Sequence, residues 1–367
     1  MLTSVHPPFD VRIFHKQARS LYRHGYQVVL IAPHSKQEVI DGIKIIPLPI
    51  PKNRYQRMTK TVLGLFKLAL KENADVYHFH DPELIPIGLL LKACTRARVL
   101  YDVHEDYPKA IMEKHWLYPW TRRYIALLFK WVEKFSSVFF DGIISATPFI
   151  AKKFIYSKNI FVVRNLPIID ELSKEEPLPW LKRSNSVAYI GKISFLRGIK
   201  EMIEAIELAS EKTEVRLILA GDFTPESLRK EIKLLSGWRL VEYKGYLSLQ
   251  EVGELVGHVK AGLVLIHPEP RYLVSYPTKL FEYMSCGIPV IASDFQIWRE
   301  LVESIGCGLL VNPLDTKGIA DAIEYLIKNP KIAEEMGARG KEAVFTRYNW
   351  NSEEKKLFSL YQDILFN

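Results

Sequence analysis

Short β-branched runs alternate with longer segments of helical period, and this alternation occurs twice along the 367 residues. The first series predicts strands at 27–32, 43–46, 76–80, 98–102, 141–145 and 160–164. The second series predicts strands at 187–190, 215–220, 240–243, 262–266, 290–292 and 309–311. Strand–helix alternation of this kind is typical of a parallel sheet with helices on both faces. The chain is therefore predicted to be an α/β protein with two doubly wound, Rossmann-like domains.

A proline-containing segment with a cluster of charges and neither period separates the two series. We predict a linker at 168–185, between an N-terminal domain at 1–167 and a C-terminal domain at 186–349. The last residues, 350–367, have helical apolar spacing, and this helix is predicted to pack back on the N-terminal domain. Doubly wound sheets bind ligands at the carboxyl ends of their strands, so the two domains are expected to face a shared cleft.

The cysteines and the apolar runs indicate a cytoplasmic location. Cys94, Cys286 and Cys307 are widely spaced and contain no C-x-x-C pair, so neither a disulfide framework nor a zinc site is indicated. The apolar runs are far shorter than the roughly 18 residues that span a bilayer. The N-terminus lacks the basic and apolar regions of a secretory signal.

The positive charge is concentrated in the first half of the chain. Residues 1–167 hold 25 Lys and Arg against 13 Asp and Glu, whereas the rest holds 25 against 29. Within the first half, the amphipathic helix predicted at about 54–71 suits an anionic membrane, on the inner face of the cell membrane. The alternative is a helix whose apolar stripe faces the core. Nucleic acid is not an expected partner, because the basic residues are not interleaved with aromatic ones.

The first strand of the second series ends in a turn suited to a diphosphate. Gly191 and Lys192 follow the strand, and Arg197 and Gly198 lead into a helix. Two cations at a glycine turn before a helix N-terminus favour a bound anion. The alternative is a pair of solvated cations on an ordinary loop.

A second candidate phosphate site precedes the helix that begins near residue 278. Its predicted donor-binding residues are Ser275, Pro277, Thr278 and Lys279, which lie at the positive end of the helix. Glu282 follows one turn later, where a carboxylate can accept the hydroxyls of a ribose. The alternative is a capped helix with an acidic residue in its first turn.

Polar residues in the first half are predicted to line the acceptor side of the cleft. In the segment HPPFD, the stiff turn is expected to project Phe9, Asp10 and Arg12 into the cleft, although Asp10 could instead cap the first helix. In the segment HFHDPE, His80 and Asp81 are expected to face the cleft. His78 and His80 could suggest a metal, but no further ligands appear at metal spacing, so no metal site is predicted.

The order of these motifs resembles the family 4 retaining glycosyltransferases of the GT-B fold. The C-terminal half carries GK-x4-RG, AGD, KGY and PTKLFEYMSCGIPVIAS. The N-terminal half carries DVYHFHDPELIP and LYDVHEDYP, which are similar to a branch that builds polysaccharides and glycolipids. The resemblance covers almost the whole chain.

The resemblance implies a role for individual residues. It makes Lys192 and Arg197 the clamp on the donor diphosphate, Glu282 the ribose ligand and Tyr246 a neighbour of the base. His104 would reach the donor sugar from the opposite domain, with Glu105 on the acceptor side. The family usually has a glutamate where this chain has Val274, so the resemblance leaves the sugar contact of that position unassigned.

The implied reaction moves a hexosyl group from a UDP- or GDP-sugar to a hydroxyl of a glycan or lipid-linked acceptor, with retention of configuration. No cofactor is expected, and no metal, because the chain has no D-x-D motif. Two alternatives stay open. A nucleotide-sugar epimerase of the same fold would share the cleft, and a catalytically silent scaffold docked on a membrane is conceivable because of Val274.

Overall fold

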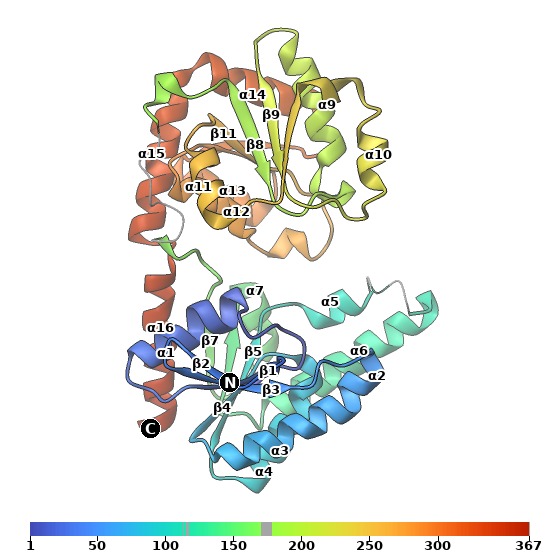
Figure 1. Cartoon of the computed structure of the whole chain (residues 1–367), viewed down its shortest axis with the longest axis vertical. Coiled ribbons are helices and arrows are strands. Elements are labelled where there is room, and N and C mark those ends of the chain that lie inside the picture. Colours follow the sequence, from blue (N-terminus) through green and yellow to red (C-terminus); the bar gives the residue numbers. More distant parts are fainter. Residues whose placement is uncertain (113, 115–116, 170–177, 367) are drawn as a thin grey trace. The chain divides into compact units, whose positions relative to one another are not determined.

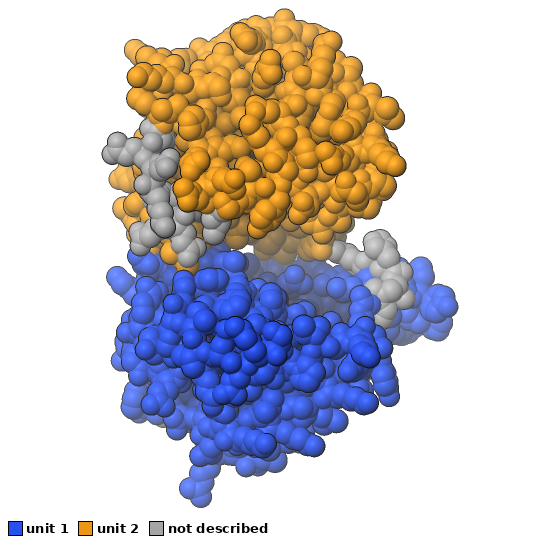
Figure 2. All heavy atoms as spheres, in the orientation of Figure 1, with its two compact units in different colours: residues 1–165, 350–367 blue, residues 166–349 orange. Residues whose placement is uncertain are grey.

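The computed structural model describes residues 1–112, 114, 117–169 and 178–366. The chain divides into two compact units, one formed by 1–165 with 350–367 and the other by 166–349 (Figure 2). Residues 170–177 of the predicted linker lie outside the described residues.

Unit 1 contains a mostly parallel sheet (Figure 1). Its strands are β1 (Val29–Pro33), β2 (Glu38–Ile40), β3 (Ile43–Leu48), β4 (Val76–Phe79), β5 (Arg98–Val103), β6 (Gly142–Ser145) and β7 (Ile160–Val162). They pair in the orders β1-β3-β2 and β4-β5-β6-β7, with only β2 antiparallel to its neighbour. Leu2 bridges the two sets through Ile31 of β1 and Phe79 of β4, so the first residues of the chain lie at the centre of the sheet.

Helices surround this sheet. They are η1 (Val11–Ala18), α1 (Arg19–Arg23), α2 (Arg54–Gln56), η2 (Arg57–Thr61), α3 (Val62–Glu72), η3 (Pro82–Leu84), α4 (Ile85–Cys94), α5 (Tyr107–Met112), α6 (Pro119–Ser137), α7 (Pro148–Ala151), η4 (Lys152–Phe154) and α16 (Trp350–Phe366). The C-terminal helix α16 packs on unit 1, as predicted. Its Trp350 indole donates to the Ser20 hydroxyl at 2.8 Å, and the Glu353 carboxylate accepts from the backbone N–H of Arg164 at 2.9 Å.

The apolar stripe at 54–71 faces the core, which is the alternative considered for it. Val62, Leu65 and Ala69 are buried in the core of unit 1, so this stripe faces the sheet and the basic residues form the solvated back of the helix. The periodicity predicts the stripe but not what covers it. Among the described residues, no helix is long and apolar enough to cross a bilayer.

Unit 2 contains six parallel strands in the order β10-β9-β8-β11-β12-β13. They are β8 (Ser186–Ile190), β9 (Arg216–Ala220), β10 (Val241–Gly245), β11 (Ala261–Val264), β12 (Val290–Ser293) and β13 (Gly308–Val311). Every described residue of the central strands β8, β11 and β12 is buried, as expected for a sheet covered on both faces. The order reverses between β8 and β11, which is where doubly wound sheets bind ligands.

The helices of unit 2 are η5 (Trp180–Lys182), η6 (Phe195–Arg197), α9 (Ile199–Ser210), α10 (Leu228–Ile232), η7 (Ser236–Leu240), α11 (Leu249–Val256), η8 (Tyr272–Val274), α12 (Thr278–Ser285), α13 (Gln296–Ile305), α14 (Thr316–Lys328) and α15 (Pro330–Thr346). Two domains of parallel α/β structure are thus confirmed.

Candidate active site

Three glycines terminate adjacent strands of unit 2 and draw their ends together. Gly191, Gly221 and Gly245 follow β8, β9 and β10 with φ angles of +123°, +128° and +71°. Gly191 donates to the carbonyl of Ala220, and Gly221 donates to that of Gly245, each at 2.7 Å. A Cβ on Gly221 would lie 2.0 Å from the Gly191 carbonyl oxygen. The conformation and the close approach favour glycine at 191 and 221, whereas at 245 only the positive φ does so.

The predicted clamp residues lie on the loop between β8 and α9. Arg197 ends the short helix η6, and Gly198 turns the chain into α9 with a φ of +67°. A Cβ on Gly198 would lie 2.7 Å from the carbonyl oxygen of Leu265. The glycine therefore lets this loop pack against the chain that follows β11, on the other side of the point where the strand order reverses.

A cavity of about 350 Å³ opens at this point. It is lined by Lys192, Arg197, Ile266, Tyr272, Ser275, Tyr276, Pro277, Thr278, Lys279 and Trp298. Both candidate phosphate segments of the sequence thus contribute to one cavity. Trp298 comes from α13 and was missed, because its helical spacing suggests only a core residue. Its indole donates to the Ser275 carbonyl at 2.7 Å and so holds the loop before α12.

The cavity is cationic. Pro277 precedes α12 and no side chain caps the helix, so the positive end of the helix is available to an anion. Burial lowers the pKa of Lys279 below its usual value, Arg197 lowers it further, and Glu282 opposes the shift. A Cβ on Gly191 would lie 2.2 Å from the Lys279 ammonium nitrogen, so the ammonium group occupies the space over this glycine. Such an arrangement can hold a diphosphate.

Other residues singled out for the donor do not line this cavity. Glu282 is half-buried on α12, close enough to Lys279 to act on its pKa. Tyr246 follows β10 and is 78% exposed. Val274 ends η8, one residue before Ser275 of the lining.

In unit 1, two of the predicted acceptor residues, Asp81 and Asp10, instead accept hydrogen bonds from the N-terminal segment of the chain. Asp81 is buried, and its carboxylate accepts from the Thr3 hydroxyl at 2.8 Å and from the backbone N–H of Ser4 at 2.6 Å. The expectation that Asp81 faces a cleft is therefore wrong. Asp10 caps η1 through the backbone N–H groups of Arg12 and Ile13, which is the alternative considered for it.

Arg12 and His80 are also buried, which corrects their expected exposure. The Arg12 guanidinium makes a two-pronged ion pair with Asp102, at 3.2 and 2.9 Å, and donates to the Val163 carbonyl at 3.0 Å. Burial acts to raise the pKa of Asp102, but Arg12 and the neighbouring histidines outweigh it and hold that pKa well below the usual range. Arg12 is thus an internal counter-ion of this carboxylate.

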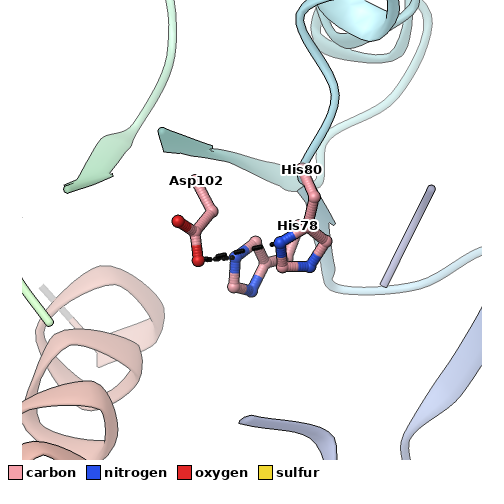
Figure 3. Close-up of side chains that lie close together, drawn as sticks. All are labelled: His78, His80 and Asp102. Carbon is pink, nitrogen blue, oxygen red and sulfur yellow. Dashed lines mark ion pairs between the residues drawn. The ribbon is translucent and has the colours of Figure 1, made fainter. Parts of the chain in front are cut away.

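His78, His80 and Asp102 form the one group of described side chains that could hold a metal ion (Figure 3). Nε2 of His78 lies 3.6 Å and Nδ1 of His80 3.7 Å from the same Asp102 oxygen, a third ligand that spacing in the sequence did not reveal. However, Arg12 already pairs with this carboxylate, Gln17 donates to it, and a guanidinium repels a cation. His78 Nδ1 is engaged with the Tyr361 hydroxyl at 2.9 Å. The Arg12 pairing therefore argues against a cation at Asp102, whereas Nε2 of His78 and both ring nitrogens of His80 are buried without a hydrogen-bond partner among the described residues.

His104 and His6 lie next to each other, close to this group. Their rings make an edge contact at 5.1 Å, and the Tyr107 hydroxyl lies 3.4 Å from Nε2 of His104. Burial lowers the pKa of His104, whereas Asp10, Asp81 and Glu105 outweigh burial and raise that of His6. Glu105 is exposed, and Phe9 is 41% exposed. His6 and Tyr107 were missed. The position of His6, in the loop that follows the bridge made by Leu2, was the available signal.

Two Rossmann-like units in one chain, one with a cationic cavity where its strand order reverses, are the arrangement found in glycosyltransferases of the GT-B fold. Two family models support this class: "Glycosyltransferase Family 4" matches residues 11–165, and "Glycosyl transferases group 1" matches residues 170–343. The chain belongs to the family 4 glycosyltransferases, which transfer sugars from nucleotide-sugar donors.

Individual relatives agree with this assignment. A phosphatidyl-myo-inositol mannosyltransferase of Mycobacterium leprae is 22% identical over 356 residues, which cover 93% of this chain and 89% of the relative. The structure of Anabaena HepE in complex with UDP and glucose has a TM-score of 0.72 at 16% identity and covers 99% of this chain and 98% of its own. Sucrose-phosphate synthase from Thermosynechococcus elongatus has a TM-score of 0.71 at 20% identity, with 95% and 92% covered.

Proposed function

We propose that this glycosyltransferase moves a hexosyl group from a UDP- or GDP-sugar to a hydroxyl of a glycan or lipid-linked acceptor, with retention of configuration and without a metal ion. The observation that carries the proposal is the cavity in which Lys192, Arg197 and Lys279 meet the N-terminus of α12. The complex of HepE with UDP and glucose supports the choice of donor, and the phosphatidyl-myo-inositol mannosyltransferase supports a lipid-linked acceptor.

In the proposed mechanism, the bond between sugar and diphosphate loosens while the clamp stabilises the charge that develops on the diphosphate. Lys192 and Arg197 supply this charge stabilisation, with Lys279 and the amides of α12 beside them. An oxygen of the leaving phosphate accepts the proton of the attacking hydroxyl on the same face of the sugar, which retains the configuration. His104 contacts the donor sugar, and Glu282 accepts hydrogen bonds from the ribose.

The same charges support the proposal that no metal ion is needed. A divalent ion in a transferase would neutralise the leaving diphosphate, and here two or three side-chain cations and a helix dipole are available for that task. Activity should therefore survive dialysis against a chelator.

Substitution of the clamp tests the proposal. We expect Lys192→Ala and Arg197→Ala each to lower kcat/KM by about 10- to 100-fold, because each removes a charge-assisted hydrogen bond. Lys200→Ala is the control, since Lys200 lies on the neighbouring helix α9 and is half exposed beside Glu204. If both clamp variants turn over the correct donor as fast as the control, the site assignment is wrong.

The donor is found first by thermal shift with UDP-, GDP-, ADP- and dTDP-sugars, because a ligand that binds only the folded state raises its Tm. Product analysis then separates the proposal from the alternatives. Transfer to an added acceptor supports it, whereas release of nucleotide and a rearranged free sugar without any acceptor indicates an epimerase. Absence of nucleotide binding indicates a silent scaffold.

A further inference from the structure

Helix α6 of unit 1 exposes its apolar side. The amphipathic spacing of its sequence would normally place large apolar residues against the protein. In α6 these residues are between 47% and 71% exposed, namely Trp120, Tyr124, Leu127, Leu128, Trp131 and Phe135. Their spacing of three and four residues places them on one side of the helix. We call this side the α6 face.

The opposite side of α6 is attached to the unit by small and polar groups together with Phe129, which packs against the core of unit 1 and the Tyr107 ring. Ala126, Ser136 and Ser137 are buried, and the buried carboxyl of Glu133 accepts from the Tyr101 hydroxyl of β5 at 3.0 Å. Most of the large apolar side chains of α6 thus lie on the side away from the unit. This orientation is the reverse of that of an ordinary surface helix, and it leaves the α6 face without cover among the described residues.

Cations flank the α6 face. Arg123 and Lys130 are exposed, and the Lys134 ammonium lies 4.3 Å from the centre of the Tyr156 ring. Tyr156 and its neighbour Ile155 are 59% and 66% exposed, so they extend the apolar surface beyond the helix. The only carboxylate of α6 is the buried Glu133.

We propose that the α6 face docks unit 1 on an anionic lipid bilayer, with the helix lying in the plane of the interface. Tryptophan and tyrosine favour the boundary between headgroups and acyl chains, and Lys and Arg beside them bind anionic headgroups. The α6 face combines both features with an absence of exposed carboxylates on the helix. A helix of 19 residues is about 28 Å long, which allows the whole apolar row to enter the interface at once.

Charge favours a bilayer over a second copy of the chain. A symmetric dimer through the α6 face would bring the same surface of both copies together. Arg123 and Lys130 would then approach their own counterparts, and α6 has no exposed carboxylate to pair with them. An anionic lipid surface instead complements these charges. The proposal does not depend on the donor chemistry of unit 2.

Vesicle flotation of the full chain tests the proposal. We expect binding to vesicles of phosphatidylcholine mixed with phosphatidylglycerol, and binding weaker by about tenfold or more to phosphatidylcholine alone. Trp120→Ser with Trp131→Ser should weaken binding to the mixed vesicles by about tenfold or more, because two large aromatic side chains no longer enter the interface. Arg123→Glu with Lys130→Glu should do the same and also reduce the dependence on salt.

The matched control is Tyr55→Ser with Leu63→Ser. These residues are 80% and 57% exposed on the other basic helical segment, so this pair removes exposed apolar surface elsewhere. Far-ultraviolet circular dichroism and donor binding to unit 2 verify that each variant is folded. The proposal is overturned if the control weakens vesicle binding as much as the α6 variants do. It is also overturned if Trp120→Ser with Trp131→Ser leaves vesicle binding intact and instead converts a dimer into a monomer.

Discussion

The buried carboxyl of Glu133 makes the orientation of α6 measurable through stability. Glu133 is 5% exposed, and its partner is the Tyr101 hydroxyl. Burial raises its pKa, with Asp106 adding to the rise and Tyr101 and Lys153 opposing it, to about 7 from the usual 4.5. Glu133→Gln keeps the shape of the side chain and an oxygen that can accept from Tyr101, but it removes the titration.

The direction in which stability changes with pH follows from the fact that Glu133 is an acid whose pKa is raised in the folded chain. Between pH 4.5 and 7 the folded chain holds the Glu133 proton more tightly than the unfolded chain, so the free energy of unfolding falls as the pH rises through this range. A rise of the pKa from 4.5 to about 7 corresponds to about 3 kcal/mol in full. Between pH 5 and pH 8, the linkage relation predicts that the free energy of unfolding of the wild type falls by about 2 to 3 kcal/mol because of Glu133, a fall that Glu133→Gln does not show.

Urea unfolding of the wild type and Glu133→Gln at pH 5, 6, 7 and 8 measures this difference. The other titrating groups are common to both chains and cancel when one free energy is subtracted from the other. We expect the free energy of unfolding of Glu133→Gln, relative to that of the wild type, to increase steadily up to about pH 7 and then to stay constant. A difference that does not change with pH would mean that Glu133 is solvated, and the α6 face would then not be the outward side of the helix.

Two further predictions concern the charges of each unit. As the pH rises through the lowered pKa of Lys279, the ammonium loses its charge and nucleotide binding should weaken, whereas Lys279→Arg should stay flat from pH 7 to 10. Calorimetric titration with the nucleotide checks this, and identical profiles would contradict it. In unit 1, Asp102→Asn should lower the free energy of unfolding by about 3 kcal/mol or more, because it leaves the buried Arg12 guanidinium unpaired. Asp41→Asn, in the exposed ion pair with Arg19, should lower the free energy of unfolding by less than about 1 kcal/mol. Equal losses for the two variants would contradict the burial of the Arg12–Asp102 pair.

The sequence predicts the strands of both units because each strand is a local apolar run. The exception is β2, a three-residue antiparallel edge strand that is too short to produce a period. The donor cavity is also predictable, since a glycine turn and the start of a helix are local features. Lys192, Arg197, Ser275, Pro277, Thr278 and Lys279 all line the same cavity as a result. Trp298 reaches it from a distant helix, so nothing in its local sequence indicates the contact.

The acceptor side was less predictable because burial there depends on residues far apart in the chain. His78 is covered by Tyr361, which lies 283 residues later, and Asp81 is engaged by Thr3 and Ser4 at the beginning of the chain. No local pattern reports such pairings. In the same way, the helical period at α6 predicts an apolar side but not the direction in which it points, since that direction is set by Glu133 and Tyr101.

The burial of Arg12, His80 and Asp81 changes what can recognise an acceptor. These side chains are occupied within unit 1, so of the residues proposed for the acceptor Phe9 and Glu105 remain exposed, and Glu105 lies with His104 in the loop that follows β5. This loop continues directly into α5, and α5 packs against α6 (Figure 1). A bilayer bound at the α6 face would therefore lie next to α5, which follows the loop that holds His104. A lipid-linked acceptor fits this arrangement better than a free glycan, because the membrane itself would then bring the acceptor to the enzyme.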